Sequence, residues 1–273
     1  MADETLSDDR QELQEHSPVS LTVSSSAKLR QNTASRVRKA RSGAAKRIRT
    51  ARRLRKAASF RSVDSRPQYQ ERPLQVAVKR VFDGLASLAG LILLAPLLIG
   101  VAAAVKLTSK GPVFFRQTRL GLNGQPFSIL KFRTMYVDRC DASGLKHTVA
   151  GDPRITAVGR FLRRSSFDEL PQLINVLRGQ MSLVGPRPYV PGMQAGGIAY
   201  ECLDYRYYDR LRVLPGITGL AQVNGYRGDA SDEEAARIRL EYDLAYIENT
   251  GLWLDIKIIA RTIIREFFKG SGA

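Results

Sequence analysis

The sequence predicts a mostly helical α/β domain that associates with a membrane. An uncharged apolar run from Gly84 to Val105 is long enough to cross a bilayer as a helix. After it, residues 127–135 alternate like a strand, and residues 252–269 show the spacing of an amphipathic helix. We therefore assign residues 73–110 to a membrane segment and residues 111–273 to one folded domain.

Residues 1–72 are predicted to form a disordered tail, because they are polar and highly charged. Between residues 28 and 66 the tail holds fifteen Lys and Arg against one acid, within a net charge of +17 for the chain. Anionic lipid headgroups and nucleic acid phosphates both fit such a charge. Because a membrane segment follows and Phe60 is the one aromatic residue there, we expect anionic membrane lipids and no nucleic acid.

The apolar run contains Pro96 near its middle, where a proline removes a backbone hydrogen bond and bends a helix. Lys79 and Arg80 precede the run and Lys106 and Lys110 follow it, so the positive-inside rule gives no orientation. These residues fit either a spanning helix or a re-entrant helix hairpin that returns to the same face of the membrane.

The next segment predicts a β-hairpin, with strands at residues 112–117 and 127–135 and a turn at residues 121–124. Strand alternation places Lys131 and Arg133 on one face. They are either a solvent-facing pair or a clamp for phosphate.

Two adjacent carboxylates, Asp168 and Glu169, are predicted to start a helix that ends before Gly179. At that end the helix dipole favours the ionised form of both. Apolar residues at helical spacing predict one buried face: Leu170, Leu173, Ile174 and Leu177. Ser166 and Glu169 also form a capping box, although Pro171 makes Asp168 an equally good cap, so the register stays open.

The surroundings of these carboxylates favour phosphoryl transfer. An aspartate can attack phosphorus if arginines or a divalent metal offset the charge of the phosphate. Pro186 and Pro188 fix the backbone on both sides of one of these arginines. The nearby arginines are Arg163, Arg164, Arg178 and Arg187.

The chain has only two histidines and two cysteines. A histidine metal site, a Ser-His-Asp triad and a disulfide framework are therefore not expected, and the cysteine content suggests a reducing compartment.

The C-terminal part predicts a turn-rich loop at residues 214–227, a capped helix from residues 231–234 to Asn249, and a last helix at residues 252–269. That last helix carries a basic row beside an apolar face, which fits an interfacial membrane helix or packing against the core. The row is Lys257, Arg261, Arg265 and Lys269.

Six motifs in order give the chain from about Lys79 to Lys269 a family resemblance. They are Lys79-Arg-Val-Phe-Asp83, Lys131-Phe-Arg-Thr-Met135, Asp168-Glu-Leu-Pro-Gln172, Val184-Gly-Pro-Arg-Pro188, Pro215-Gly-Ile-Thr-Gly219 and Ala221-Gln-Val-Asn-Gly225. The chain resembles the monotopic phosphoglycosyl transferases, bacterial sugar transferases that initiate exopolysaccharide synthesis by loading a sugar phosphate onto undecaprenyl phosphate.

The resemblance implies a role for each matching residue. Asp168 matches the nucleophile that takes hexose 1-phosphate from a UDP-hexose and releases UMP, and Glu169 matches the acid associated with Mg²⁺. Positions that match phosphate or nucleotide contacts are Lys131, Arg163, Arg187 and Arg227. Pro96 matches the break of a re-entrant helix, which decides for the hairpin, although Ala95 stands where the family often has Ser.

The resemblance also implies the wider setting of the protein. We expect it at the cytoplasmic face of a bacterial inner membrane. Residues 226–257 are similar to glucose-type initiators, so glucose 1-phosphate is expected and galactose 1-phosphate is the alternative. The sequence leaves open a homodimer, and also a non-catalytic basic membrane protein that binds nucleic acid or acts as a scaffold.

Overall fold

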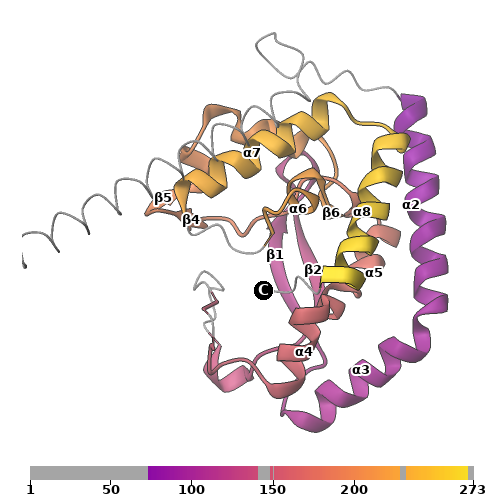
Figure 1. The fold of residues 1–273 in the computed structure, drawn as a ribbon, viewed down its shortest axis with the longest axis vertical. Helices are drawn as coiled ribbons and strands as arrows, with labels where there is room; N and C mark the ends of the chain where they lie inside the picture. Colours follow the sequence, from indigo (N-terminus) through magenta and orange to yellow (C-terminus); the bar gives the residue numbers. More distant parts are fainter. Residues whose placement is uncertain (1–72, 141–147, 150, 228–231, 270–273) are drawn as a thin grey trace, which may run out of the picture. The chain divides into compact units, whose positions relative to one another are not determined.

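The computed structural model describes residues 73–140, 148–149, 151–227 and 232–269. The predicted tail lies outside the described residues, and so does Ser231 of the second predicted capping box. Helices are in the majority among the described elements (Figure 1), so the expectation of a mostly helical α/β domain is confirmed.

The helices are α2 (Pro73–Leu93), α3 (Ala95–Thr108), α4 (Ala157–Ser165), α5 (Gln172–Leu177), α6 (Leu220–Val223), α7 (Glu233–Glu248) and α8 (Leu252–Lys269). The strands are β1 (Phe114–Leu120), β2 (Pro126–Phe132), β3 (Ser182–Val184), β4 (Gln194–Ala195), β5 (Ile198–Ala199) and β6 (Gly216–Thr218). Five 3₁₀ segments connect them: η1 (Leu122–Gly124), η2 (Val137–Arg139), η3 (Phe167–Glu169), η4 (Tyr200–Cys202) and η5 (Tyr205–Arg212).

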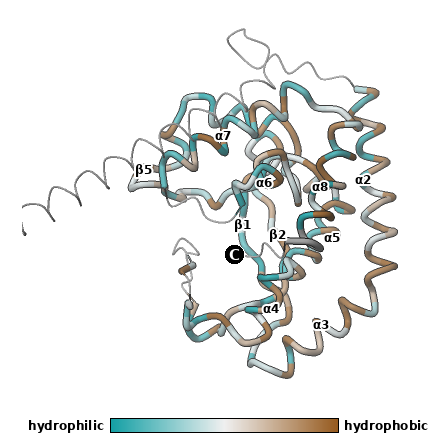
Figure 2. Tube along the Cα trace, in the orientation of Figure 1, coloured by the Kyte–Doolittle hydropathy of each residue, from teal (hydrophilic) through white to brown (hydrophobic). Residues whose placement is uncertain are grey.

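The apolar run forms the bent pair of α2 and α3, which meet at Leu94 with an angle of 65°. Pro96 lies in the first turn of α3, where its missing N–H costs no helical hydrogen bond. White to brown hydropathy colours run through the bend in Figure 2. Among the described residues no single helix has the length and apolar composition to span a membrane, and only this bent pair does so jointly.

A buried polar network attaches α2 to the rest of the domain, and we call it the anchor network. Lys79 Nζ lies 2.6 Å from Asp255 Oδ2 on α8. Asp83, which is 1% exposed, accepts a 2.7 Å hydrogen bond from Ser182 Oγ on β3. The hydroxyl of Tyr246 on α7 lies 2.8 Å from Asp255 Oδ1. The network therefore joins α2 to three elements that are distant in sequence.

The predicted hairpin is confirmed, with strand ends shifted by a few residues. β1 and β2 pair antiparallel from Phe114 opposite Phe132 to Leu120 opposite Pro126. In the turn, Asn123 and Gly124 have φ angles of 53° and 74°, a left-handed conformation that these residue types tolerate.

Neither alternative for the pair holds for Arg133, which faces no solvent and forms no clamp with Lys131. Arg133 is buried beyond the end of β2 and donates to the backbone oxygens of Val105, Ser109 and Lys110. Those carbonyls at the C-terminal end of α3 lack helical partners, so a guanidinium satisfies them well.

α4 packs closely onto the chain that follows β2. Thr156 caps α4 by accepting a 2.8 Å hydrogen bond from Gly159 N. A Cβ at Gly159 would lie 2.0 Å from the Thr134 carbonyl oxygen, so only glycine permits this approach. The approach brings the C-terminal end of α4, with Arg163, next to β2.

The helix predicted after the carboxylates begins later than expected, and its predicted buried face is only partly buried. Gln172, Asn175 and Val176 are the fully buried residues of α5, whereas Leu177 is exposed. The predicted apolar face packs against α2, a single helix that covers it only in part. Gly179, at φ +81°, follows the helix end as predicted.

Asn175 shows why a polar residue takes the inner position of α5. Its Oδ1 accepts a 2.9 Å hydrogen bond from Leu130 N, and its Nδ2 donates to Ser128 O at 2.8 Å. The carboxamide thus satisfies backbone groups of β2 that have no strand beside them.

The predicted loop at residues 214–227 contains regular structure. β6 pairs in parallel with β3, and α6 follows directly. A Cβ at Gly185 would lie 2.4 Å from the Leu214 carbonyl oxygen, so glycine permits this close pairing. Short, irregular strands of this kind carry no alternation that a sequence pattern can detect.

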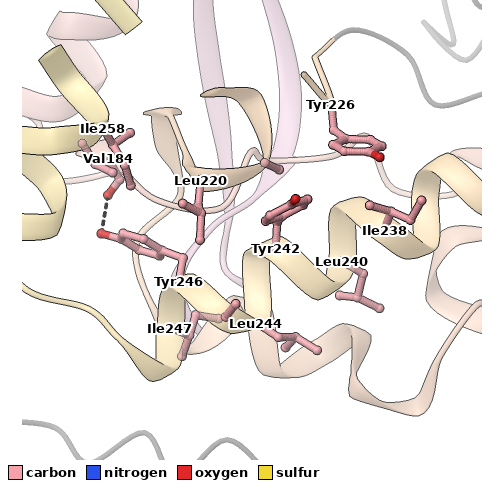
Figure 3. Packing of buried hydrophobic residues seen from close by; sticks show 12 residues of the cluster. Val184, Leu220, Tyr226, Ile238, Leu240, Tyr242, Leu244, Tyr246, Ile247 and Ile258 are labelled. Atoms are coloured by element: carbon pink, nitrogen blue, oxygen red, sulfur yellow. Dashed lines mark hydrogen bonds between the residues drawn. The ribbon is translucent and has the colours of Figure 1, made fainter. Parts of the chain in front are cut away.

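The main core forms where α7 packs against α6, and Ile258 of α8 joins the same cluster; the buried side chains of α7 line it (Figure 3). Tyr246 reaches the Val184 carbonyl oxygen of β3 at 3.0 Å. Asp232 caps α7 in place of the predicted Ser231. α8 buries Ile258, so the predicted packing against the core is present, and it exposes Trp253. The predicted interfacial membrane position stays a prediction.

Candidate active site

Asp168 and Glu169 lie on η3, a single turn between α4 and α5, and not at the start of a long helix. Ser166 precedes them with φ +61° and makes no side-chain capping bond, so the predicted capping box is absent. Its hydroxyl instead accepts a hydrogen bond from the Arg227 guanidinium. The left-handed turn at Ser166 redirects the chain, so that both carboxylates face β2 and the segment after β3.

Glu169 joins two cations that come from distant parts of the chain. Lys131 Nζ donates to Glu169 Oε1 at 2.8 Å. Arg187 donates to both carboxylate oxygens, at 2.6 Å to Oε1 and 3.2 Å to Oε2. Their side chains are 16%, 12% and 21% exposed in the order Lys131, Glu169 and Arg187. Two-point contact with a partly buried carboxylate fixes the orientation of the arginine fork.

These contacts shift the pKa values of the two adjacent carboxylates in opposite directions. Burial would raise the pKa of Glu169, but the charges of Arg187 and Lys131 hold that pKa well below its usual value. Burial and the charge of Glu169 raise the pKa of Asp168 to about 6. The sequence-based expectation that the helix dipole favours ionisation of both therefore fails for Asp168.

Asp168 differs from its neighbour in its contacts as well. Within the described part of the chain, no side chain or backbone group donates a hydrogen bond to its carboxylate. Lys131, Arg163 and Arg187 act on it only through their charges, which lower its pKa. An oxygen of Asp168 is therefore free to react with a ligand in a way that those of Glu169 are not.

Arg163 completes a group that we call the dyad cluster. Its Nε donates to Thr134 Oγ1 at 2.9 Å, and its NH1 donates to Thr148 Oγ1 at 3.1 Å. The dyad cluster consists of Lys131, Arg163, Asp168, Glu169 and Arg187. Arg227 lies at its edge through the contact with Ser166, so the structure brings all the predicted binding residues together.

Sequence reasoning missed the support beneath Arg187. The Arg210 guanidinium donates to the Arg187 carbonyl oxygen and lies 2.9 Å from Asp243 Oδ2. It also lies 3.9 Å from the ring centre of Tyr189, a cation–π contact. The available signal was that Asp243 interrupts an apolar run at the end of α7, from Tyr242 to Ile247.

The dyad cluster fits Mg²⁺ only as an ion shared with a substrate. The described residues contain no group of three or more metal-ligating side chains. Glu169 and Asp168 supply carboxylate oxygens, and Mg²⁺ is commonly bound by one or two carboxylates together with substrate phosphates. The donor set is therefore suitable for a metal that arrives with a phosphate ligand.

Three cations around a reactive carboxylate can bind a diphosphate and offset the charge that resists attack at phosphorus. The geometry thus supports phosphoryl transfer with a carboxylate nucleophile.

Comparison with known proteins places this geometry in a family context. A family model for bacterial sugar transferases matches residues 74–269. The chain is 48% identical over 199 residues to the exopolysaccharide production protein PSS of Rhizobium leguminosarum bv. phaseoli, covering 73% of this chain and 100% of that protein. It is 51% identical over 203 residues to the undecaprenyl-phosphate glucose phosphotransferase of Komagataeibacter xylinus, covering 73% of this chain and 38% of that protein.

A third relative is the UDP-glucose:undecaprenyl-phosphate glucose-1-phosphate transferase of Caulobacter vibrioides. It is 50% identical over 185 residues, which cover 68% of this chain and 68% of that protein.

Proposed function

This chain belongs to the bacterial sugar transferases, and from that premise we propose that it transfers glucose 1-phosphate from UDP-glucose to undecaprenyl phosphate, as the first step of exopolysaccharide synthesis. The names of the K. xylinus and C. vibrioides relatives support the sugar and the acceptor, and that of the R. leguminosarum relative supports the pathway. The observation that carries the proposal is the position of Asp168 beside Glu169, which two cations already hold.

In the first transfer, an oxygen of Asp168 forms a bond to the β-phosphorus of the UDP-sugar. The bond from that phosphorus to the bridging oxygen breaks, and UMP leaves with the oxygen. Lys131, Arg163 and Arg187 offset the charge of the diphosphate during this step. The sugar phosphate then remains on Asp168 as an acyl phosphate.

In the second transfer, a phosphate oxygen of undecaprenyl phosphate forms a bond to the same phosphorus. The bond to the Asp168 oxygen breaks, which restores the carboxylate and releases undecaprenyl diphosphate glucose. No proton needs to be moved in either transfer.

We propose that Glu169 holds Mg²⁺ together with the phosphate oxygens of the substrate. The ion would supply positive charge at the diphosphate. Because Glu169 already contacts Lys131 and Arg187, its charge is shared between these cations and the metal.

We further propose that α2 and α3 insert as a re-entrant hairpin at the cytoplasmic face of a bacterial inner membrane. Support comes from the 65° bend and from exposed apolar side chains on both helices, among them Leu85, Ile92 and Ile99. On α8, Trp253 is 68% exposed and Lys257 Nζ lies 5.0 Å from its ring centre. Such aromatic and basic pairs suit the headgroup region of a bilayer.

The test measures UMP release by the protein in nanodiscs, from UDP-glucose and from UDP-galactose, with and without undecaprenyl phosphate and Mg²⁺. We expect lipid-dependent turnover with UDP-glucose and a loss of roughly 10³-fold or more in Asp168→Asn. Radiolabel from the glucose phosphate should stay on wild-type protein when the lipid is absent. Undiminished turnover in Asp168→Asn would disprove the covalent mechanism.

A further inference from the structure

An apolar groove of about 610 Å³ lies between α3 and α4, outside the dyad cluster. Its volume falls in the range of roughly 300–1,000 Å³ that is typical of small-molecule sites. Figure 1 shows α3 and α4 next to one another, below the β1–β2 hairpin. No charged side chain lines the groove, and its walls include Leu97, Gly100 and Val101 from α3 with Val158, Phe161 and Leu162 from α4.

Two features place the groove next to the dyad cluster. On α4, Leu162 of the groove is followed directly by Arg163 of the cluster. On the surface, the exposed ring of Phe161 meets the ring of Phe167 edge to face, with centroids 6.2 Å apart. Phe167 immediately precedes Asp168. Apolar side chains therefore extend from the groove to the residue that precedes the reactive carboxylate.

We propose that this groove binds the isoprene units nearest the phosphate of the acceptor lipid. This proposal rests on the proposed function, because it assumes a polyprenyl phosphate acceptor. A ligand with an anionic head and an apolar tail matches a cationic cluster that adjoins an apolar groove. The donor UDP-sugar has no apolar portion of this kind, so the groove distinguishes the second substrate from the first.

Small residues open the groove, and Gly100 provides a direct way to close it. A Cβ at Gly100 would meet no atom within 4 Å, and the residue has an ordinary helical backbone. Gly100→Leu should therefore fill the groove without strain in the fold. Gly84→Leu on α2 is the matched control, because a Cβ there also meets nothing within 4 Å and Gly84 does not line the groove.

The kinetic test compares the KM for undecaprenyl phosphate with the KM for UDP-glucose in both variants. We expect Gly100→Leu to raise the acceptor KM relative to the donor KM by about tenfold, the effect of losing a methylene-sized contact in an apolar site. A soluble short-chain prenyl phosphate should show a similar change, because it keeps the isoprene units nearest the phosphate. Equal effects of Gly100→Leu and Gly84→Leu would overturn the proposal.

A binding test decides the proposal without turnover. Farnesyl phosphate that carries a benzophenone is photo-crosslinked to the protein in phospholipid nanodiscs, and the labelled peptides are identified by mass spectrometry. We expect labels within residues 96–104 and 157–162, which excess undecaprenyl phosphate removes and Gly100→Leu weakens. Labels elsewhere would overturn the proposal. Labels in the groove that only added phospholipid removes would also overturn it, because they would assign the groove to a bilayer acyl chain. If no UDP-sugar yields UMP, the proposed function fails while this test still reports on the groove.

Discussion

The dyad cluster contains three cations and two carboxylates, whereas the anchor network contains one cation and two carboxylates. In the anchor network, Asp83 accepts bonds from Ser182 Oγ and Leu183 N, and Lys79 bridges to α8. Each carboxylate there accepts hydrogen bonds that hold elements of the fold together. In the dyad cluster Glu169 is used in the same way, but Asp168 receives no hydrogen bond from the described residues. An excess of positive charge around a carboxylate that receives no hydrogen bond suits a polyanionic substrate. A network in which every carboxylate is hydrogen-bonded suits the attachment of a helix.

After loss of the nucleophile itself, the largest expected effect comes from Glu169→Gln, which removes the charge between Lys131 and Arg187. The loss of a preorganised charged group should lower the rate of UMP release by roughly 10²- to 10³-fold. The charge of Glu169 also helps to raise the pKa of Asp168. The midpoint of the pH–rate profile should therefore move below about 6 in this variant.

Two readouts distinguish this prediction from a general loss of structure. A melting temperature near that of wild type with a reduced rate and a lowered midpoint would confirm that Glu169 tunes Asp168. An unchanged midpoint would show that Glu169 acts on the substrate and not on its neighbour.

The anchor network should respond in the opposite way, with a loss of stability and little loss of substrate affinity. Asp83→Ala leaves Ser182 Oγ and Leu183 N without this acceptor, and Lys79 keeps only Asp255. Each buried group that is left unpaired costs about 1–3 kcal/mol. The measurement is thermal unfolding in nanodiscs, together with the KM for UDP-glucose. Asp83→Asn is the control, because it keeps an acceptor oxygen and should unfold at a temperature between the other two.

A clear loss of turnover in Asp83→Ala at unchanged melting temperature would contradict this separation. It would mean that the network sets the position of β3, and through β3 that of Arg187.

The sequence predicted the members of the dyad cluster, but not the contacts of the anchor network, and the difference has a physical origin. Each of three cluster residues lies in a short motif whose residue types alone indicate its chemistry: Lys131, Asp168 and Arg187. The bond between Asp83 and Ser182 joins residues 99 positions apart, and neither position shows a local pattern that indicates it. Long-range polar contacts of this type depend on how the helices pack and not on periodicity.

The wrong predictions have similar causes. A capping box at Ser166 is the usual outcome of its sequence pattern, but the guanidinium of Arg227, 61 residues away, binds the hydroxyl instead. Arg133 was expected beside Lys131, yet the C-terminal carbonyls of α3 draw it into a buried position. In both cases a tertiary partner outcompetes a local preference.

A smaller effect is expected for Arg187→Lys, which keeps the charge but loses the fork that contacts both oxygens of Glu169. The rate should fall by about 10- to 100-fold, mainly through weaker binding of the diphosphate. Steady-state kinetics with UDP-glucose should show a raised KM. A fall of the same size in kcat at constant KM would mean that Arg187 stabilises the transition state and does not contribute to binding of the diphosphate.

The smallest effect concerns pH in the wild-type protein. Asp168 attacks only as a carboxylate, so the rate of UMP release in the first transfer should fall tenfold per pH unit below a midpoint of about 6. Burial lowers the pKa of Lys131, so the rate should decline again at alkaline pH, before an ordinary lysine would lose its proton.

The raised pKa of Asp168 also affects stability, because ionising this buried carboxyl opposes folding. The stability of wild type should therefore decrease as the pH rises toward about 6, and Asp168→Asn should not show that decrease. The check is the single-turnover rate of wild type against pH, together with the melting temperatures of wild type and Asp168→Asn against pH. If the rate midpoint lies near the usual value for aspartate, the burial of Asp168 does not govern its reactivity, and the contrast with the anchor network rests on hydrogen bonding alone.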